Sequence, residues 1–324
     1  MNTTMRTAMA DPVGFHGIDI GGTKIELASY DAALREVHRE RIATPAEDIQ
    51  AFTAAVRGLV LRADAALGTR AGHAPVGIGL PGITDRASGR QLSSNVPALN
   101  GRVVHALLRD ALARPVAICN DCQCFALSEA DGGAADGLPT MFGAILGTGA
   151  GAGYCVGGRL QRGRNGIAGE WGHWSLPATL AARYDLAPVP CPCGRTGCLE
   201  RYVSGPGMRR LHLHFGGDGV EPFAIAARAG AGDVVAQRTL AAHLDLLAYG
   251  LAGVVLAIDP HAVVLGGGLS NLPHLYRDLP EAIGRHLFAG AHPPPILPPR
   301  FGDAGGVRGA ALLIRQLWKD TPTP

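Results

Sequence analysis

Two short glycine-rich stretches carry residue types that could hold phosphate groups. The first reads GIDIGGTKIELASYD and places Asp19 just before a Gly21–Lys24 centre, with β-branched runs on both sides. The second reads ILGTGAGAG, with a Gly-Thr-Gly tip at 147–149. Such a pattern indicates a hairpin whose backbone N–H groups and threonine hydroxyl can approach a phosphate closely. A third glycine run, at 266–268, follows a later apolar segment.

These stretches do not match the two common nucleotide-binding motifs. Gly17 and Gly22 have the spacing of a P-loop, but Thr23 precedes Lys24 and a strand-like segment follows. The run GTGAGAG has alanine at position 152 and leads into another strand, which is not the dinucleotide-binding pattern. Simple tight turns would explain one glycine tip, whereas three in one chain favour phosphate binding.

Three cysteines and one histidine have the spacing of a zinc site. Cys191, Cys193 and Cys198 lie in CPCGRTGC, and His173 lies upstream in GEWGHW. Three thiolates and one imidazole complete a tetrahedral zinc site without an open position, so we predict a structural zinc ion held by the loop 191–198. A redox pair or coincidental thiols would be the weaker interpretation of three cysteines in so short a segment.

A second group of cysteines lies at positions 119, 122 and 124. Cys119 and Cys122 formally make a C-x-x-C pair, but no thioredoxin-like pattern surrounds them. We therefore interpret all three as small buried residues.

The segments between the motifs alternate between strand-like and helix-like patterns, which is typical of an α/β fold. The GTG hairpin repeats the design of the opening hairpin, so we expect an internal duplication in shape. We further expect strands within 34–44, 74–85 and 115–120, helices at about 48–67, 101–113 and from 121 onward, a long helix and strand within 244–270, and a closing helix within 306–320.

Size and composition exclude several classes of protein. With 324 residues, of which 47% are apolar, the chain can bury two cores. A net charge of +2 with scattered arginines argues against a nucleic-acid partner. The longest unbroken apolar run, 246–258, is 13 residues and too short to span a membrane. Residues 1–14 lack an apolar signal core, so we expect a flexible tail on a cytoplasmic protein.

Together these pieces resemble one family, the ROK sugar kinases, from Gly17 to about Leu313. The resemblance is carried by GIDIGGTK, GIGLPG, SSNVPALNG, NDCQCFALSEA, ILGTGAGAG, GEWGH, CPCGRTGCLERYVSG, VVLGGGLS and GDAGGVRGAA. It implies an actin/hexokinase-like, ribonuclease H-like α/β fold of two domains with a cleft between them. We expect an N-terminal domain at 15–119, joined by the closing helix at about 307–319, and a larger C-terminal domain at 120–306.

The resemblance also implies a role for individual residues. Asp121 matches the catalytic base of the family, and Asp19 would hold Mg²⁺ through water. The sugar-binding residues would be Asn95, Asn120, Asp121, Glu170, His173 and Glu200. The ATP-binding residues would be Asp19, Gly21, Gly22, Thr23, Lys24, Gly147, Thr148 and Gly149, with Gly266 and Gly267 near the adenosine. The zinc ligands would be His173, Cys191, Cys193 and Cys198.

Simpler roles for four of these residues stay open. Asp121 opens a helical run and could also cap it. Asp19 could be a capping or turn acid, although a position between Ile18 and Ile20 in a strand makes this less expected. Glu170 could be only a surface acid and His173 only a metal ligand, but in the family the zinc loop orders the sugar pocket, so both roles are compatible.

Within the family, the stretches CFALSEA, NVPA, GGGLSN and GDAGGVRGAA and the long spacer between His173 and Cys191 resemble the N-acetyl-D-glucosamine kinases. We therefore expect ATP-dependent phosphorylation of the 6-hydroxyl of this amino sugar, by a protein that forms a homodimer. Alternatives are a glucokinase, a fructokinase or an N-acetylmannosamine kinase of the same family. A sugar-binding repressor would need a DNA-binding domain, and only 16 residues precede Gly17. A catalytically inactive scaffold is disfavoured by Asp121 and both glycine loops.

The chain departs from the family pattern beside the expected base. The family commonly has Asp-Asn-Asp-Ala-Asn where this chain has Cys-Asn-Asp-Cys-Gln at 119–123. Asn120 and Asp121 are kept, but Gln123 is one methylene longer than asparagine and two thiols flank the base. The departure puts the rate and the sensitivity to oxidation in question rather than the type of reaction.

Overall fold

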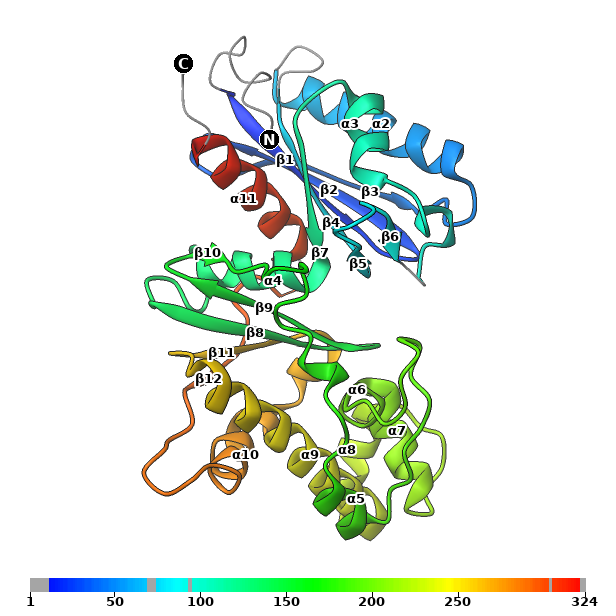
Figure 1. Ribbon diagram of the computed structural model, residues 1–324, viewed down its shortest axis with the longest axis vertical. Helices are drawn as coiled ribbons and strands as arrows, with labels where there is room; N and C mark the ends of the chain where they lie inside the picture. The colour runs from blue at the N-terminus through cyan, green and yellow to red at the C-terminus, as the bar shows by residue number, and fades with distance from the viewer. Residues whose placement is uncertain (1–11, 69–73, 93–94, 303–304, 321–324) are drawn as a thin grey trace. The chain divides into compact units, whose positions relative to one another are not determined.

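The structure is a computed structural model that describes residues 12–68, 74–92, 95–302 and 305–320 (Figure 1). The described chain divides into two compact units. Unit 1 comprises residues up to 128, the segment 160–168 and the C-terminal residues, and unit 2 comprises 129–159 and 169–302. Most of the tail expected at 1–14 lies outside the described residues. The expected domain boundary at 119 differs from the unit boundary at 128, because the intervening helix packs within unit 1.

A five-stranded sheet of order β3-β2-β1-β4-β7 forms the centre of unit 1. Strands β1, β2 and β3 are antiparallel neighbours, whereas β4 and β7 run parallel to β1. The hairpin and the third strand predicted from the sequence are therefore confirmed. The strands are β1 (Gly14–Ile20), β2 (Lys24–Asp31), β3 (Glu36–Ala43), β4 (Val76–Leu80) and β7 (Val116–Asn120), with a small separate hairpin of β5 (Ile83–Thr84) and β6 (Gln91–Leu92).

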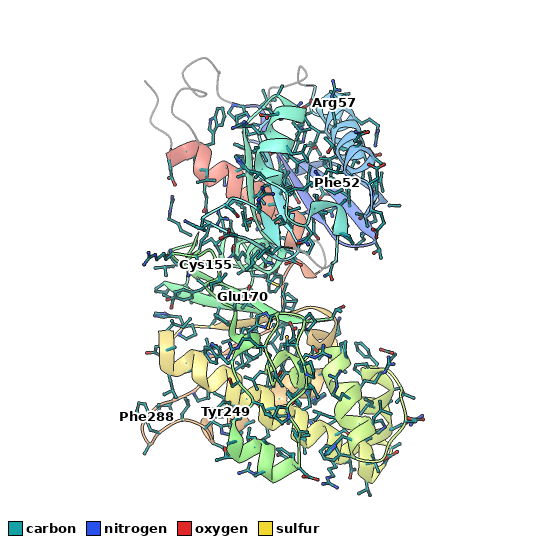
Figure 2. The ribbon with its side chains drawn as sticks, turned by 45° about the vertical axis from the view of Figure 1, so that its right-hand side comes forward. Phe52, Arg57, Cys155, Glu170, Tyr249 and Phe288 are labelled. Atoms are coloured by element: carbon teal, nitrogen blue, oxygen red, sulfur yellow. The ribbon has the colours of Figure 1, made fainter. Side chains whose placement is uncertain are left out.

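Helices cover both faces of this sheet (Figure 1). Helices α2 (Ile49–Ala66) and α3 (Val104–Leu112) lie on one face, and α11 (Gly305–Asp320) lies on the other. Asp48 caps α2 by accepting the N–H groups of Gln50 and Ala51, and the fully buried Phe52 follows in the core of unit 1 (Figure 2). The short helix η1 (Pro97–Leu99) and helix α4 (Asp121–Ala130) complete the elements of this unit.

Glycines let α11 lie directly on the sheet and on α4. A Cβ atom on Gly17 would lie 2.0 Å from the carbonyl oxygen of Val307, and one on Gly77 would lie 1.7 Å from that of Ala310. A Cβ on Gly309 would lie 1.7 Å from the carbonyl oxygen of Cys124. Only glycine permits backbones to approach so closely, so α11 is fixed against both β1–β4 and α4.

The sheet of unit 2 repeats the topology of the first sheet. Its order is β10-β9-β8-β11-β12, with an antiparallel β8–β9 hairpin followed by two parallel strands. The internal duplication in shape is therefore confirmed. The strands are β8 (Thr140–Leu146), β9 (Ala150–Val156), β10 (Arg159–Leu160), β11 (Val263–Gly266) and β12 (Ile296–Leu297).

The helices of unit 2 pack mostly around the long helix α9 (Val234–Ile258). Among the described residues, α9 is the one helix long and apolar enough to cross a membrane by length and composition. Its Leu246, Leu247 and Leu251 are fully buried in the core of unit 2, as expected for a core helix, while Tyr249 lies at its surface (Figure 2). The other helices are η2 (Trp171–His173), α5 (Ala178–Tyr184), α6 (Glu200–Val203), α7 (Gly205–His214), α8 (Pro222–Gly230), η3 (Gly268–Asn271) and α10 (Pro273–Gly284).

Candidate functional site

The first glycine loop is a tight β1–β2 connection in unit 1. The N–H of Gly21 donates to the carbonyl oxygen of Lys24 over 2.9 Å, and the hydroxyl of Thr44 donates to the carbonyl oxygen of Gly21 over 2.7 Å. A Cβ atom on Gly22 would lie 2.7 Å from the carbonyl oxygen of Asn95, so Asn95 lies directly beside the loop. The loop is therefore held from two sides, while Thr23 and Lys24 remain exposed.

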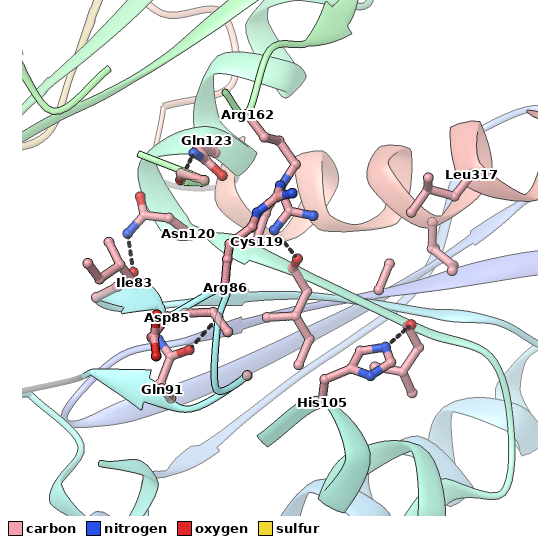
Figure 3. Close-up of a pocket in the computed structure, with 18 residues that line it drawn as sticks. Ile83, Asp85, Arg86, Gln91, His105, Cys119, Asn120, Gln123, Arg162 and Leu317 are labelled. Carbon is pink, nitrogen blue, oxygen red and sulfur yellow. Dashed lines mark hydrogen bonds between the residues drawn. The ribbon is translucent and has the colours of Figure 1, made fainter. Parts of the chain in front are cut away.

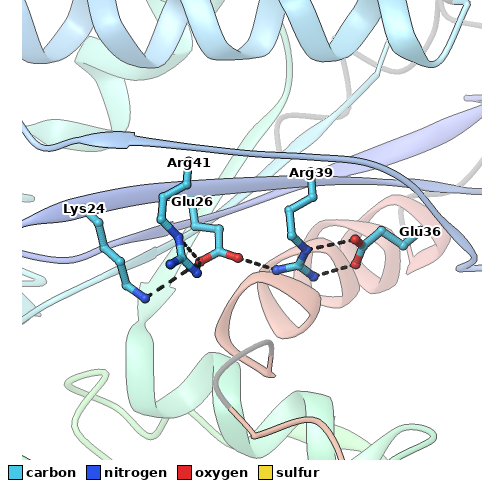
Figure 4. A network of polar contacts seen from close by, with 5 residues as sticks. All are labelled: Lys24, Glu26, Glu36, Arg39 and Arg41. Carbon is cyan, nitrogen blue, oxygen red and sulfur yellow. Dashed lines mark hydrogen bonds and ion pairs between the residues drawn. The ribbon is translucent and has the colours of Figure 1, made fainter.

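Lys24 lies at one end of a network of polar contacts centred on Glu26 (Figure 4). The Nζ of Lys24 lies 3.9 Å from Glu26, whereas Arg39 and Arg41 donate hydrogen bonds of 2.5 and 2.6 Å to the Glu26 carboxylate. Burial alone would raise the pKa of Glu26, but these two hydrogen bonds hold it below its usual value. Because the arginines neutralise Glu26, the exposed Lys24 ammonium is available to an anion at the loop.

Asp19 and Asp121 place two carboxylates close together in unit 1. A Cβ atom on Gly79 would lie 3.4 Å from Oδ1 of Asp19 and 3.7 Å from Cα of Asp121. Burial, and then the charges of Asp121 and Glu26, raise the pKa of Asp19 to about 7. Gly306, in the first turn of α11, leaves room for the Asp19 carboxylate at the positive end of that helix. Such a pair favours a divalent cation, which would relieve the repulsion.

Asn120 and Asp121 are oriented where β7 passes into α4. The N–H of Cys122 donates to Oδ1 of Asn120 over 2.8 Å and to Oδ1 of Asp121 over 2.9 Å. The amide of Asn120 donates to the carbonyl oxygen of Gly82 over 2.9 Å. Burial raises the pKa of Asp121 above its usual value, against the hydrogen bonds from Cys122. A carboxyl group with a raised pKa is a stronger base than an ordinary aspartate.

The residues that depart from the family pattern are largely inside the fold. Cys119 and Cys124 are buried as predicted, with their sulfur atoms 3.1 Å apart, whereas Cys122 is half-buried. Cys119 thus lies close to Cys124, five positions further along the chain. Gln123 is also buried, and its amide donates to the carbonyl oxygen of Gly166 over 3.0 Å. Its extra methylene therefore extends the side chain towards the segment 160–168.

The second glycine loop joins β8 and β9 in unit 2. The N–H of Gly147 donates to the carbonyl oxygen of Gly149 over 2.9 Å, which closes the turn. The N–H of Gly205 donates to the carbonyl oxygen of Gly147 over 2.8 Å, and the N–H of Ala150 donates to the Glu200 carboxylate over 3.0 Å. The α6–α7 region therefore holds both sides of this loop.

The third glycine run lies beside the second loop. Gly266 ends β11, and Gly267 has a φ of 76°, which favours glycine. A Cβ atom on Gly267 would lie 2.6 Å from the carbonyl oxygen of Leu146, the last residue of β8. The two predicted ATP-binding glycine segments of unit 2 are therefore neighbours.

The four predicted metal ligands come together in unit 2. One ligand atom from each of His173, Cys191, Cys193 and Cys198 lies within 4.8 Å of all the others. The sulfur atoms of Cys193 and Cys198 are 3.6 Å apart, and Nδ1 of His173 lies 3.8 Å from the sulfur of Cys191. Tetrahedral zinc with bonds of about 2.0–2.3 Å requires ligand separations of about 3.5–3.8 Å, so the residues fit a zinc ion.

Two carboxylates flank this cluster. Oε2 of Glu170 lies 3.6 Å from Nε2 of His173, on the ring side away from Cys191. Oε1 of Glu200 lies 3.9 Å from the sulfur of Cys191, while its other oxygen binds Ala150. A carboxylate on the second nitrogen of a metal-binding histidine orients the ring. Glu200 thus connects the cluster to the second glycine loop.

Each unit therefore gathers a coherent part of the predicted site. Unit 1 holds Asp19, Gly21, Gly22, Thr23, Lys24, Asn95, Asn120 and Asp121. Unit 2 holds Gly147, Thr148, Gly149, Glu170, His173, Glu200, Gly266, Gly267 and the three cysteines. Sequence reasoning missed Thr44 and Gly205, which fasten the two loops. For Gly205 the available signal was the Ser-Gly-Pro start of a helix, with Ser204 as its cap.

Curated relatives resemble this chain over nearly its whole length. An N-acetylgalactosamine kinase, AgaK, of Shewanella sp. strain ANA-3 is 45% identical over 92% of this chain and 96% of its own. An N-acetyl-D-glucosamine kinase of Yersinia enterocolitica is 41% identical over 92% of this chain and 98% of its own.

Solved structures share the fold. A ROK hexokinase from Thermus thermophilus has a TM-score of 0.83 at 33% identity, covering 95% of this chain and 99% of the other. A ROK family glucokinase from Streptomyces griseus, solved with glucose and AMPPNP, has a TM-score of 0.74 at 28% identity, covering 94% and 99%. The family model for ROK proteins matches residues 15–317. This match covers the glycine loops, Asp19 near the end of β1 and the Cys₃His cluster. The chain therefore belongs to the ROK family.

Proposed function

We propose that this protein transfers the γ-phosphoryl group of ATP to the 6-hydroxyl of N-acetyl-D-glucosamine, giving N-acetyl-D-glucosamine 6-phosphate and ADP. The observation that supports the proposal most strongly is the position of Asp121 at the start of α4. The chain is a member of the ROK family and has two glycine-rich hairpins suited to binding phosphate. The Yersinia relative is an N-acetyl-D-glucosamine kinase, and the Streptomyces glucokinase was solved with glucose and AMPPNP.

In the proposed reaction Asp121 accepts the proton of the sugar's 6-hydroxyl. Phosphoryl transfer proceeds through a loose transition state, so the proton leaves late and positioning of the hydroxyl matters most. Asn120 is fixed by Gly82 and Cys122, which leaves its orientation settled before the sugar binds. Asn95 lies beside the first loop, where it would bind a further hydroxyl.

The nucleotide would be held by both glycine loops and by Lys24. Their N–H groups, the hydroxyls of Thr23 and Thr148 and the exposed ammonium of Lys24 are donors that suit phosphate oxygens. Asp19 would hold Mg²⁺ through water, and the ion would neutralise charge on the transferring phosphoryl group. Gly266 and Gly267, beside the second loop, would approach the adenosine.

A zinc ion in the Cys₃His cluster would be structural, because four protein ligands leave no position for a substrate. The cluster fixes His173 through Nδ1 and lies next to Glu200, and Glu170 faces the other nitrogen of His173. These three side chains are the proposed sugar ligands of unit 2. Zinc would thus order part of the sugar site as well as the loop.

A second candidate acceptor is N-acetylgalactosamine, which differs from N-acetylglucosamine in the configuration at C4. It is favoured by the 45% identity to the Shewanella kinase. A coupled assay of ADP release over N-acetylglucosamine, N-acetylgalactosamine, N-acetylmannosamine, glucose and fructose decides between them. We expect the highest kcat/KM for N-acetylglucosamine, because an acetamide pocket leaves polar groups unpaired when glucose binds. A preference for glucose would contradict the amino-sugar assignment.

A homodimer in the cytoplasm remains our proposal for the assembly and its location, and it rests on the family resemblance. Multi-angle light scattering of the purified protein tests the dimer. A mass of about one chain at micromolar concentration would contradict it.

A further inference from the structure

A pocket of about 430 Å³ lies within unit 1, and no residue of the first glycine loop lines it (Figure 3). Strand β7, at the edge of the sheet, forms its longest wall. The β5–β6 hairpin, the segment 160–168 and the end of α11 form the others. Its volume is in the range of sites for small molecules. Asn120 is the predicted site residue on its wall.

The edge of β7 is protected by side chains rather than open to another strand. Nε2 of His105 lies 3.0 Å from the carbonyl oxygen of Val116, and Nη2 of Arg162 donates to that of Ile118 over 2.9 Å. Occupied carbonyl groups at an edge disfavour the addition of an extended peptide. The pocket therefore suits a small molecule.

Two arginines supply unused donors in this pocket. Nε of Arg162 is buried and has no hydrogen-bond acceptor among the described residues. Arg86 is exposed and forms no ion pair with the described part of the chain, and its Nε lies 3.7 Å from where a Cβ on Gly166 would be. Figure 3 shows both arginine side chains reaching the same part of the pocket. A buried guanidinium N–H without an acceptor is costly, so a ligand acceptor is expected there.

The other polar side chains of the pocket are already bonded within the protein. The amide of Gln91 donates to the carbonyl oxygen of Pro81 over 2.9 Å, and the hydroxyl of Thr84 donates to Gln91 over 2.8 Å. Asp85 accepts the hydroxyl and the N–H of Ser88, which hold its pKa below the usual value. The wall thus carries two guanidinium groups against one carboxylate that is engaged in its own turn.

We propose that this Arg86–Arg162 pocket binds a small organic phosphate of about monosaccharide size. Paired guanidinium groups match phosphate oxygens in charge and geometry. Ile314 and Leu317 of α11 provide an apolar wall for a carbon skeleton. Asn120 and Gln123 on the same wall flank Asp121, so an occupant would change the KM for the acceptor sugar. That kinetic effect rests on the proposed kinase function, whereas the binding itself does not.

Isothermal titration calorimetry tests the binding with N-acetylglucosamine 6-phosphate, inorganic phosphate and uncharged N-acetylglucosamine. Each titration is made on the free protein and again with the reaction site filled by N-acetylglucosamine and AMPPNP. We expect the sugar phosphate to bind in both states, and Arg86→Gln and Arg162→Gln each to weaken binding about tenfold or more. Arg164→Gln is the matched control, because Arg164 is exposed on the same segment and does not line the pocket.

The outcomes separate the proposal from its rivals. The proposed binding site would be wrong if Arg86→Gln and Arg162→Gln bound the sugar phosphate as tightly as the unsubstituted protein does. It would also be wrong if Arg164→Gln weakened binding as much as those two substitutions. If inorganic phosphate bound as tightly as the sugar phosphate, the proposal that the pocket recognises the organic part of its ligand would be wrong. The sugar phosphate could bind the free protein in an arginine-dependent way while the kinase assay shows a different acceptor sugar. That result would support the binding site and contradict only the proposed acceptor. Circular dichroism of each variant excludes loss of the fold.

Discussion

Asp121 combines a helix-start position with a raised pKa, and one substitution separates its two possible roles. We expect Asp121→Asn to lower kcat about 10²–10⁴-fold, because it removes the base while keeping size and polarity. The melting temperature should not fall, since asparagine caps a helix as well as aspartate and carries no buried charge. Steady-state kinetics and thermal denaturation measure both. Near-normal turnover in a folded variant would show that the base lies elsewhere.

Asp19 gives the cation site a pH dependence. Its pKa is raised to about 7, so the ionised form, which holds a cation, is lost as pH falls through 7. We expect the KM for Mg·ATP to rise by up to about tenfold per pH unit below 7 and to level off above it. Asp19→Asn should bind Mg·ATP weakly at every pH.

The raised pKa of Asp19 also makes folding stability depend on pH, in the direction opposite to that of a salt-bridged aspartate, whose pKa is lowered. Because the folded pKa lies above the unfolded value, the free energy of unfolding of the metal-free protein should decrease as pH rises from about 4 to about 7. Mg²⁺ should restore part of the loss.

A KM for Mg·ATP that is flat from pH 6 to 8 in the unsubstituted protein would contradict this role of Asp19.

At the scale of elements, the second loop depends on its contact with α6. A Cβ on Gly149 would lie 2.6 Å from Oε2 of Glu200, which accepts the N–H of Ala150. We expect Gly149→Ala to lower the free energy of unfolding by roughly 1–3 kcal/mol, because the carboxylate must move and the hydrogen bond is lost. Gly147→Ala is the matched control, as nothing lies within 4 Å of a Cβ there. Equal stability of the two variants by urea denaturation would refute this.

The elements next to the motifs could be predicted from the sequence, because local signals fix them. The Asp48 cap, the glycine pair before Thr23 and the alternating patterns placed β1, β2, β3, α2, β4, α3, β7, the start of α4 and the β8–β9 hairpin close to their observed bounds. The short elements β5, β6 and η1 were not predicted. Helices α5, α8 and α10 lie outside the chemical motifs of the sequence. The Cys₃His cluster could be predicted because three cysteines and a histidine at this spacing match the four ligands of a tetrahedral zinc site, which must lie close together in the fold.

Other features could not be predicted because they depend on contacts between distant segments. Arg86 and Arg162 are 76 positions apart and meet at one pocket through the fold of unit 1. The contact of Thr44 with Gly21 likewise needs the β2–β3 register. No sequence pattern predicts that the sulfur atoms of Cys119 and Cys124 lie 3.1 Å apart.

At the scale of the molecule, the two units have separate cores, so removing zinc should affect them differently. Elemental analysis should find about one zinc per chain. We expect a chelator to speed amide hydrogen exchange in residues 171–203 and to leave that of β1, β2 and β4 unchanged. Cys193→Ser should do the same and should also weaken sugar binding. Uniform acceleration in both units would contradict a local role for the metal, and full activity without metal would overturn the zinc assignment.

Unit 1 takes its sheet from the beginning of the chain and the helix α11 from its end. During synthesis on a ribosome, β1 and β4 therefore emerge long before the helix that packs on Gly17 and Gly77. Unit 2 lies between them in the chain and can bury its own core first. Until the last turn of α11 leaves the exit tunnel, one apolar face of the first sheet has no cover. We expect a released chain truncated before residue 305 to bind chaperones through that face, while unit 2 is already resistant to protease.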